Sequence, residues 1–463
     1  MQHPSTVPGP PPPPLLGRIG SEVQFLRDPL GRMMSLYRDY GTLVRTGGPT
    51  GPVFVFGQDY NQRVLSDTTV FHNPHMTRLA PPGSALHRLW SGLINMNGER
   101  HRQNRRRMMP AFQRKRVEGY QSLMGDVIER TTADWRTGEV RDLAHEMMVL
   151  TLRIVTRALF GLDSFDEMDR VGGMLKRWLD LYASIPVQLF PRDLPLTPFR
   201  TLLRLSEEVE TMLRDLVAHK RATGLGQDVL SVLMSATDDE AGALTEEELF
   251  GHVTLLYVAG HETSANALTW TFFLLEQHPT VLADVLDELQ SVLRGSAPTI
   301  ELLPQLPLLE RVIKESLRIL PPVPFSGRRG MAPFDLSGRE FPAGTQVRYS
   351  PFITHRIPEV YDAPDHFRPS RWESLDPHPY AYIPFGAGPR MCIGYSFALQ
   401  EIALTLATLL PRFRFELVPG QRVDRKALAT FAPKHGLRMR LHAQDRNLQR
   451  SAFQGDVREL FAL

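Results

Sequence analysis

The one cysteine of the 463-residue chain, Cys392, lies in the segment PFGAGPRMCIG at residues 384–394. A cysteine thiolate is a strong, soft metal ligand, but it must be kept deprotonated and shielded. Three glycines in the segment let backbone N–H groups approach the sulfur, because they carry no Cβ atom. Phe385 can cover the sulfur, and Arg390 supplies a cation suited to a carboxylate. A lone cysteine is more often a small buried hydrophobe, yet these neighbours favour a metal-ligating thiolate.

A second unusual segment, AGHETS at residues 259–264, lies inside a long apolar stretch. The sequence predicts one helix from Thr245 to about Gln277, because Thr245 with Glu248 can form a capping box and His278-Pro279 ends the pattern. At 1.5 Å per residue such a helix spans about 50 Å, and its apolar middle places it in the core. A glycine there costs about 1 kcal/mol against alanine, and burying a carboxylate costs more. The segment is therefore either a surface turn of an ordinary helix or a helix opened beside a buried ligand.

The cysteine segment resembles the haem-thiolate signature of the cytochrome P450 superfamily. The match consists of five residues at fixed spacing, which seldom arises by chance: Phe385, Gly388, Arg390, Cys392 and Gly394. Ala259-Gly260-x-Glu262-Thr263 is similar to the oxygen-activating motif of that family. The motifs that resemble the family follow its order and cover the chain from about residue 30 to about residue 440.

Further resemblances concern charged residues. Glu315-x-x-Arg318 looks like the Glu-x-x-Arg motif of the family, and Arg371 stands where a second arginine joins that pair. Alone, Glu315 and Arg318 could form an ordinary surface ion pair. With Arg371, the resemblance implies a buried network that supports the cysteine loop, so that loss of one member strands a charge and prevents haem incorporation.

Other residues match positions from which the family contacts haem propionates. His101 and Arg105 lie in GERHRQNRRRMMPAF. Arg328 is a further candidate from its spacing to Gly338, although the adjacent Arg329 leaves the register open.

The resemblance implies a haem b whose iron is held by Cys392, with Gly260 on the opposite face of the cofactor. Thr263 is then expected to steady dioxygen, and Glu262 to help deliver protons. With two electrons and two protons, one oxygen atom is inserted into an apolar small molecule by hydroxylation or epoxidation. A haem-thiolate peroxygenase or isomerase without a reductase is an alternative, which the Glu262-Thr263 pair disfavours. A non-catalytic haem sensor or carrier is another.

The expected fold class is mainly α with small β-sheets, in the cytochrome P450 fold with its long central helix across the haem. Apolar residues at helical spacing predict helices at residues 310–320 and 397–410, and strands are expected within residues 52–57 and 341–350. We expect a proline-rich flexible leader over residues 1–20, a single catalytic domain over 21–442, and a C-terminal extension of unassigned purpose over 443–463.

Composition limits the partners. The chain has 53 basic and 51 acidic side chains, a net charge of +2, which gives no reason to expect nucleic acid. It contains no apolar run long enough for a membrane anchor, and one cysteine cannot form an internal disulfide, so a cytoplasmic location is expected. No segment suggests a flavin or an iron–sulfur cluster, so electrons must come from a ferredoxin or flavodoxin and its reductase. The basic residues proposed to dock this donor are Arg102, Arg106, Arg107, Arg114, Lys115 and Arg116.

The substrate is only broadly constrained. The segments that line the family's pocket carry apolar residues that could also be plain core, and they suggest an apolar substrate of fair size: Met76, Leu86, Trp90, Leu181, Tyr182, Phe190, Leu256, Val323 and Phe325. Arg78, Lys176 or Arg192 could instead anchor a carboxylate, which would favour a fatty acid.

Overall fold

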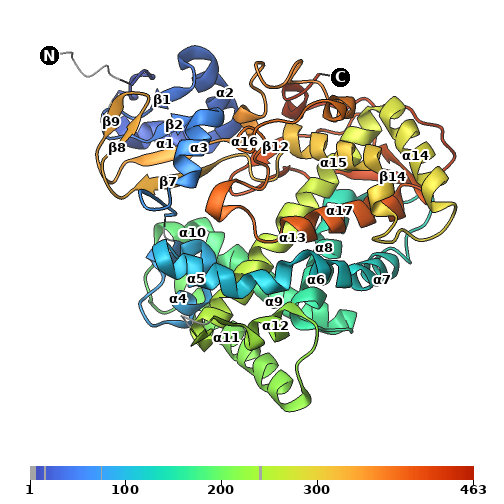
Figure 1. Ribbon diagram of the computed structural model, residues 1–463, viewed down its shortest axis with the longest axis horizontal. Coiled ribbons are helices and arrows are strands. Elements are labelled where there is room, and N and C mark those ends of the chain that lie inside the picture. The colour runs from blue at the N-terminus through green and yellow to red at the C-terminus, as the bar shows by residue number, and fades with distance from the viewer. Residues whose placement is uncertain (1–6, 15–16, 75, 239–241, 463) are drawn as a thin grey trace. The chain divides into compact units, whose positions relative to one another are not determined.

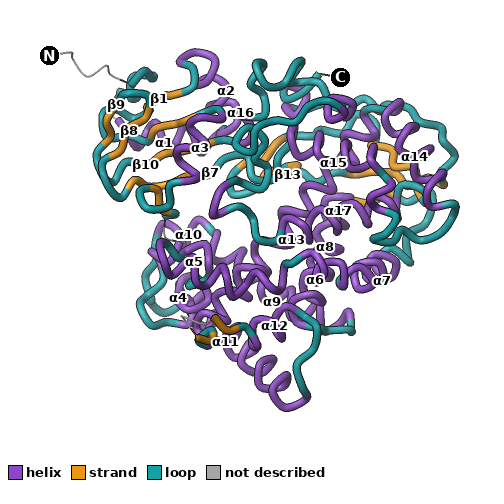
Figure 2. The backbone as a smooth tube through the Cα atoms, viewed as in Figure 1, coloured by secondary structure: helices purple, strands orange, loops and turns teal. Residues whose placement is uncertain are grey.

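The computed structural model describes residues 7–14, 17–74, 76–238 and 242–462. Helices predominate and strands are short (Figures 1 and 2), so the predicted fold class is confirmed. The predicted leader over residues 1–20 lies partly outside the described residues. Of its described part, Pro8 accepts a hydrogen bond from the Arg45 amide at 2.9 Å, and the first helix begins at Gly17.

The α-helices are α1 (Gly17–Arg27), α2 (Pro29–Tyr40), α3 (Gln58–Ser66), α4 (Ala85–Leu89), α5 (Gly98–Met108), α6 (Arg114–Gly119), α7 (Gln121–Thr131), α8 (Leu143–Phe160), α9 (Phe165–Ala183), α10 (Ile185–Leu189), α11 (Pro198–Thr223), α12 (Val229–Ser235), α13 (Glu246–Gln277), α14 (Pro279–Leu293), α15 (Pro307–Ile319), α16 (Pro351–Thr354) and α17 (Tyr395–Leu409).

The strands are β1 (Leu43–Arg45), β2 (Val53–Val55), β3 (Phe71–His72), β4 (Val140–Asp142), β5 (Thr237–Asp238), β6 (Gly242–Ala243), β7 (Ser326–Gly330), β8 (Phe334–Leu336), β9 (Arg339–Phe341), β10 (Gln346–Tyr349), β11 (Phe413–Leu417), β12 (Arg425–Ala427), β13 (Phe431–Pro433) and β14 (Arg438–Ala443). The predicted strands within residues 52–57 and 341–350 correspond to β2 and to β9 and β10.

The chain forms two compact units, each built from separated segments. Unit 1 comprises residues 1–72, 132–147 and 263–463, and unit 2 comprises residues 73–131 and 148–262. The helices α8 and α13 each have residues in both units. The prediction of one catalytic domain over residues 21–442 stays a prediction.

Unit 1 contains a five-stranded sheet in the order β1-β2-β10-β7-β3. β10 runs parallel to β2 and antiparallel to β7, so the sheet is mixed. Val53, Val55 and Val347 are fully buried, as expected for β-branched residues in the middle of a sheet. A second sheet in unit 1 has three strands in the order β11-β14-β4.

Unit 2 is helical apart from β5 and β6 among its described residues. The side chains of Trp90, Trp178 and Tyr182 form its aromatic centre, with ring centroids 5.1 Å apart for the two tryptophans and 4.7 Å apart for Trp90 and Tyr182. Arg88 donates two hydrogen bonds to the Glu210 carboxylate, both at 2.6 Å, and so joins α4 to α11.

The long helix α13 has the predicted bounds and the predicted cap. The Glu248 amide donates to Thr245 Oγ1 at 3.2 Å, and the Thr245 amide donates to Glu248 Oε2 at 3.3 Å, which completes the capping box. Its 32 residues correspond to about 48 Å at 1.5 Å per residue.

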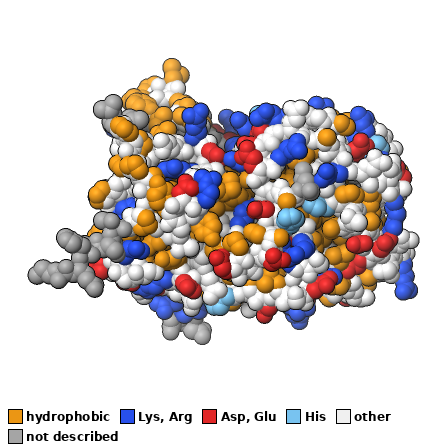
Figure 3. Space-filling model, turned by 90° about the horizontal axis from the view of Figure 1, so that it is seen from above, with side chains coloured by type: hydrophobic (Ala, Val, Ile, Leu, Met, Phe, Trp, Pro, Cys, Tyr) orange, Lys and Arg blue, Asp and Glu red, His pale blue; other side chains and the backbone are white. Residues whose placement is uncertain are grey.

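On the surface, basic and acidic side chains are interspersed over the face shown in Figure 3.

Candidate active site

The cysteine loop in unit 1 is held by its own backbone. The Cys392 amide donates to the Phe385 carbonyl at 2.9 Å, and the Met391 amide donates to the Gly388 carbonyl at 3.0 Å. Gly386 and Gly388 have φ values of 70° and 69°, in the left-handed region that side chains other than glycine seldom adopt. A Cβ atom on Gly388 would also lie 2.6 Å from the Leu65 carbonyl oxygen. These glycines are therefore required by the turn.

The loop presents Cys392 to solvent at the start of a helix. The cysteine is exposed, and α17 begins three residues later with Gly394 as its N-cap. The first N–H groups of a helix and its dipole favour negative charge nearby. The surroundings of Cys392 thus suit a thiolate.

The segment at residues 258–263 is the least covered part of the middle of α13. Ala259 is exposed, and Glu262 and Thr263 are half-buried, whereas Ser264 and the residues after it are buried. The helix is continuous through this segment. Gly260 lies in unit 2, where an added Cβ atom would come within 3.0 Å of Val155 Cγ2 on α8. Close helix packing is thus one physical reason for a glycine at this position.

A buried carboxylic acid, Glu401 on α17, was missed by the sequence-based prediction. It is 1% exposed, and the Ser264 hydroxyl lies beside its carboxyl group. Burial raises the pKa of Glu401 to about 8, and the neighbouring Ser264 hydroxyl offsets only part of this effect. Glu401 therefore carries a proton at neutral pH. The available signal was one acid inside the apolar helix at residues 397–410, nine positions after the cysteine.

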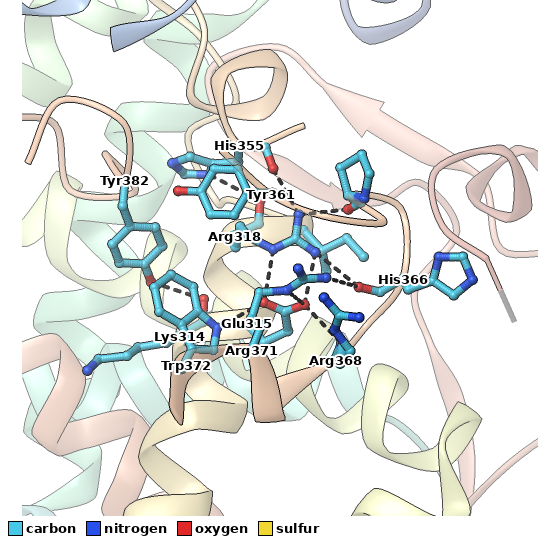
Figure 4. Close-up of polar contacts among 12 residues, drawn as sticks. Lys314, Glu315, Arg318, His355, Tyr361, His366, Arg368, Arg371, Trp372 and Tyr382 are labelled. Atoms are coloured by element: carbon cyan, nitrogen blue, oxygen red, sulfur yellow. Dashed lines mark hydrogen bonds and ion pairs between the residues drawn. The ribbon is translucent and has the colours of Figure 1, made fainter. Parts of the chain in front are cut away.

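The three charged residues of the predicted network meet in unit 1 (Figure 4). Arg318 donates to both oxygens of Glu315 at 2.9 Å, and Arg371 Nε donates to Glu315 Oε1 at 2.8 Å. Glu315 and Arg318 are completely buried. The Glu315 carboxylate also accepts from the Arg368 amide and from Trp372 Nε1, each at 2.9 Å. An ordinary surface ion pair is thereby excluded.

The electrostatics of this network depend on the hydrogen bonds. Burial alone would raise the pKa of Glu315, but the hydrogen bond from Arg318 and the charges of both arginines more than compensate, so its pKa lies below the ordinary value. The remaining guanidinium donors are satisfied by backbone carbonyls of residues 355 and 362–366. The network thus combines two guanidinium groups with one carboxylate, and backbone carbonyls complete the hydrogen bonding of the arginines.

His355 connects the network to the cysteine loop, a connection that the sequence did not reveal. Its Nδ1 lies 3.1 Å from the Arg318 carbonyl oxygen, and its Nε2 accepts from the Ile383 amide at 2.9 Å. Burial lowers the pKa of His355 to about 3, with the positive charge of Arg318 acting in the same direction, so the ring is neutral. A neutral ring with the proton on Nδ1 satisfies both contacts. The residues that follow Ile383 form the cysteine loop.

Comparison with known proteins agrees with this geometry. The model of the family "Cytochrome P450" matches residues 8–435. This chain belongs to the cytochrome P450 family. A pentalenene oxygenase of Streptomyces avermitilis is 33% identical over 92% of this chain and 95% of its own length. A cyclooctat-9-en-7-ol 5-monooxygenase of Streptomyces melanosporofaciens is 32% identical over 87% of this chain and 88% of its own. The chain is a cytochrome P450 monooxygenase.

Solved P450 structures share the fold. A retinoic-acid-bound cyanobacterial P450 has a TM-score of 0.80 and 27% identity, and covers 94% of this chain and 99% of its own. The haem domain of cytochrome P450DA has a TM-score of 0.83 and 26% identity, over 96% of this chain and 99% of its own. The family implies a haem cofactor, and the exposed cysteine on a glycine turn fits a haem with one thiolate ligand.

The predicted propionate contacts lie on both units of this P450. In unit 2, His101 and Arg105 are one turn apart on α5, with His101 buried and Arg105 half-buried. In unit 1, Arg328 is 8% exposed on β7, and its guanidinium lies 5.4 Å from the centre of the Tyr349 ring. Arg329 points to solvent, as strand alternation requires. Of these two arginines, Arg328 is the one on the inner face.

The predicted donor-docking surface needs one correction, at Arg107. Its side chain is 5% exposed and its Nη1 lies 3.3 Å from Glu248 Oε2, at the N-terminus of α13. Burial alone would raise the pKa of Glu248, but contacts with the Thr245 amide, Asn104 and two arginines bring it below the ordinary value. Arg107 is therefore a structural partner of α13. The other five basic residues are exposed or half-buried on and beside α5 and α6: Arg102, Arg106, Arg114, Lys115 and Arg116.

The residues named for a substrate pocket have different environments. The side chains of Met76 and Arg78 lie outside the described residues. In unit 2, Leu86, Trp90, Tyr182 and Leu256 are buried, Leu181 is half-buried, and Phe190 is 53% exposed. In unit 1, Val323 and Phe325 are half-buried. Lys176 is exposed and paired with Asp180 at 2.6 Å, and Arg192 is exposed.

No helix among the described residues is both long enough and apolar enough to cross a membrane.

Proposed function

We propose that this P450 binds haem b through the Cys392 thiolate and inserts one oxygen atom of dioxygen into an apolar small molecule. The cysteine loop is the observation that carries the proposal. Its glycines at φ 70° and 69° and the hydrogen bond from the Cys392 amide to the Phe385 carbonyl hold the sulfur at the start of α17. When bound, a haem with a thiolate ligand supplies the activation of dioxygen.

The chain's own residues have distinct tasks in this proposal. Backbone N–H groups at the start of α17 stabilise the thiolate, and Phe385, which is half-buried, covers it. Arg390, Arg328, His101 and Arg105 are the groups proposed to bind the propionates. Gly260 is proposed to lie beside the cofactor, and its lack of a side chain lets α13 pack closely against Val155 of α8.

Proton delivery falls to residues on α13 and α17. Glu262 is half-buried and can exchange protons with water, and the Thr263 hydroxyl can pass a proton or hold a hydrogen bond at the reacting oxygen. On the buried side, Glu401 holds a proton at neutral pH, close to Ser264. Ser264 directly follows Thr263, so we propose that Glu401 is a proton store for the same segment.

The substrate is proposed to be an apolar olefin. Two relatives are named for pentalenene and cyclooctat-9-en-7-ol. The buried apolar side chains Leu86, Trp90, Tyr182 and Leu256 fit such a molecule. Lys176, one of the cations considered as a carboxylate anchor, is exposed and forms an ion pair with Asp180 at 2.6 Å.

A spectral titration tests the substrate proposal. Pentalenene, cyclooctat-9-en-7-ol and retinoic acid are each added to the ferric protein, and the shift of the Soret band is measured. We expect the two olefins without a carboxylate to shift the band to the blue, and retinoic acid to bind at least tenfold more weakly. Tighter binding of retinoic acid would contradict the proposal.

Electrons are proposed to come from a ferredoxin or flavodoxin with its reductase, docked on the exposed basic residues of α5 and α6. Charge complementarity of this kind raises the association rate and is weakened by salt. We expect the double substitution Arg114→Ala/Lys115→Ala to slow reduction by an acidic ferredoxin severalfold at low salt. Arg177→Ala, which removes one exposed cation from α9, is the control that should leave the rate unchanged.

A further inference from the structure

The segment after β14 is an integral part of unit 1. Phe453, Val457, Leu460 and Phe461 are at most 4% exposed. The rings of Phe453 and Phe461 pack edge-on against Phe273 of α13, with centroids 5.2 Å and 5.9 Å apart. The sequence pattern assigned no purpose to residues 443–463, and this burial shows that part of the core depends on them.

The backbone of the segment is fixed at several points. The Ser451 amide donates to Glu276 Oε1 at 3.1 Å, beside the end of α13. The Val423 amide donates to the Gln454 carbonyl at 2.8 Å. The Ala462 amide donates to the Asp365 carbonyl at 2.7 Å, and Ala462 bridges to His366. The segment thus crosses unit 1 and ends on the loop at residues 362–366.

Arg356 shows that the segment completes a buried charge. It is 8% exposed, and its Nη2 donates to the Leu460 carbonyl at 2.9 Å and to the Ile319 carbonyl at 2.7 Å. Burial lowers the pKa of Arg356 to about 9, and the charge of Arg318 acts in the same direction. The ion pair with Asp365, at 3.4 Å, opposes this. Burying a cation is costly unless it is paired and hydrogen-bonded, so loss of the Leu460 acceptor should destabilise Arg356 at this position.

The loop at residues 362–366 also accepts hydrogen bonds from the arginines of the Glu315 network. The His366 carbonyl accepts from Arg318 at 3.1 Å and from Arg371 at 3.2 Å. The Pro364 carbonyl accepts from Arg318 at 2.7 Å. Arg318 is linked through His355 to the Ile383 amide, directly before the cysteine loop. One continuous set of contacts therefore runs from Ala462 to the cysteine loop.

We propose that residues 451–462 form a C-terminal strap that positions the cysteine loop. The strap holds the loop at residues 362–366 and Arg356, these fix Arg318, and Arg318 and His355 fix Ile383. The residues of the strap are positioning residues that act through this chain. The inference rests on the proposed function, in which Cys392 is the thiolate ligand.

Two variants that disturb the strap, each with a matched control, test this proposal. Ala462→Pro removes the N–H that donates to Asp365, while Ala462→Gly keeps it. Deletion of residues 457–463 removes the whole end of the strap, and Asn447→Ala alters an exposed residue just before it. For each, the fraction of the reduced, carbon-monoxide-bound protein with the thiolate-type Soret band is measured, together with hydrogen exchange in the peptide containing Ile383.

We expect the deletion to lose most of the thiolate-type band. Ala462→Pro should speed exchange at Ile383 by about tenfold and lower the thiolate-type fraction, whereas Ala462→Gly and Asn447→Ala should match the wild type. A folded Ala462→Pro protein with unchanged exchange and an unchanged band would overturn the inference, even if the deletion variant fails to fold. If the wild type itself lacks a thiolate-type band, the proposed function fails, and exchange at Ile383 still decides whether the strap positions this loop.

Discussion

Two buried acids in unit 1, Glu315 and Glu401, illustrate opposite uses of a carboxylate. Glu315 accepts hydrogen bonds from two arginines, a tryptophan and a backbone amide, and its pKa is below the ordinary value. Glu401 is buried with only the Ser264 hydroxyl acting against the effect of burial, and its pKa rises to about 8. A carboxylate surrounded by donors stays charged and fixes structure. One that is buried without such donors keeps its proton and can release it during a reaction.

The largest effect is expected from breaking the Glu315 network. Arg318→Ala leaves the Glu315 carboxylate buried with Arg371 as its only cationic partner, and loss of one member of a buried ion pair costs about 3–5 kcal/mol. Lys314→Ala, which removes a half-exposed cation from the same helix, is the control. Urea unfolding and haem content measure the difference. Equal stability of the two variants would show that the network is dispensable.

The pH dependence of stability tests the opposite behaviour of Glu401. Because its pKa is raised in the folded protein, the folded state binds the proton more tightly, and stability is lost as pH rises from about 4.5 to about 8. The slope is about 1.4 kcal/mol per pH unit within that window. Glu401→Gln should remove this slope, whereas Glu340→Gln, at an exposed site, should retain it. Urea unfolding at several pH values gives the comparison, and parallel curves for wild type and Glu401→Gln would refute the assignment.

The reaction itself is expected to depend on Thr263, next to Ser264. Thr263→Ala removes the hydroxyl that handles the proton, and general acid–base groups contribute about 10²–10⁴-fold. Product formed per electron consumed should fall tenfold or more, with the remaining electrons appearing in peroxide, while haem stays bound. Thr263→Ser should recover most of the coupling. Unchanged coupling in Thr263→Ala would remove this residue from the mechanism.

The smallest effect is expected from two glycine substitutions in the cysteine loop, which distinguish backbone strain from a steric clash. Gly386→Ala adds a side chain at φ 70° where no atom lies within 4 Å, so it costs only the left-handed strain of about 1–2 kcal/mol. Gly388→Ala adds the same strain and a 2.6 Å approach to the Leu65 carbonyl oxygen. In thermal unfolding, Gly388→Ala should therefore have a lower melting temperature than Gly386→Ala. The reverse order would show that the loop adapts.

Local features were predictable from the sequence. The capping box of Thr245 and Glu248, the end of α13 and the glycine turn before Cys392 each depend on residues a few positions apart. Contacts between distant residues were not. Arg107 looked like a surface cation until Glu248, 141 positions away, was seen beside it. His355 and the strap at residues 451–462 act through long-range contacts. The apolar spacing around Glu401 predicts a helix, but it does not predict that the carboxyl group itself is buried.

The most direct test of the account is the spectrum of the reduced, carbon-monoxide-bound protein, with Cys392→Ala as the comparison. The account predicts the red-shifted Soret band of a thiolate ligand in the wild type and its complete loss in Cys392→Ala. A histidine-type band in the folded wild type, or a thiolate-type band that persists without Cys392, would contradict it.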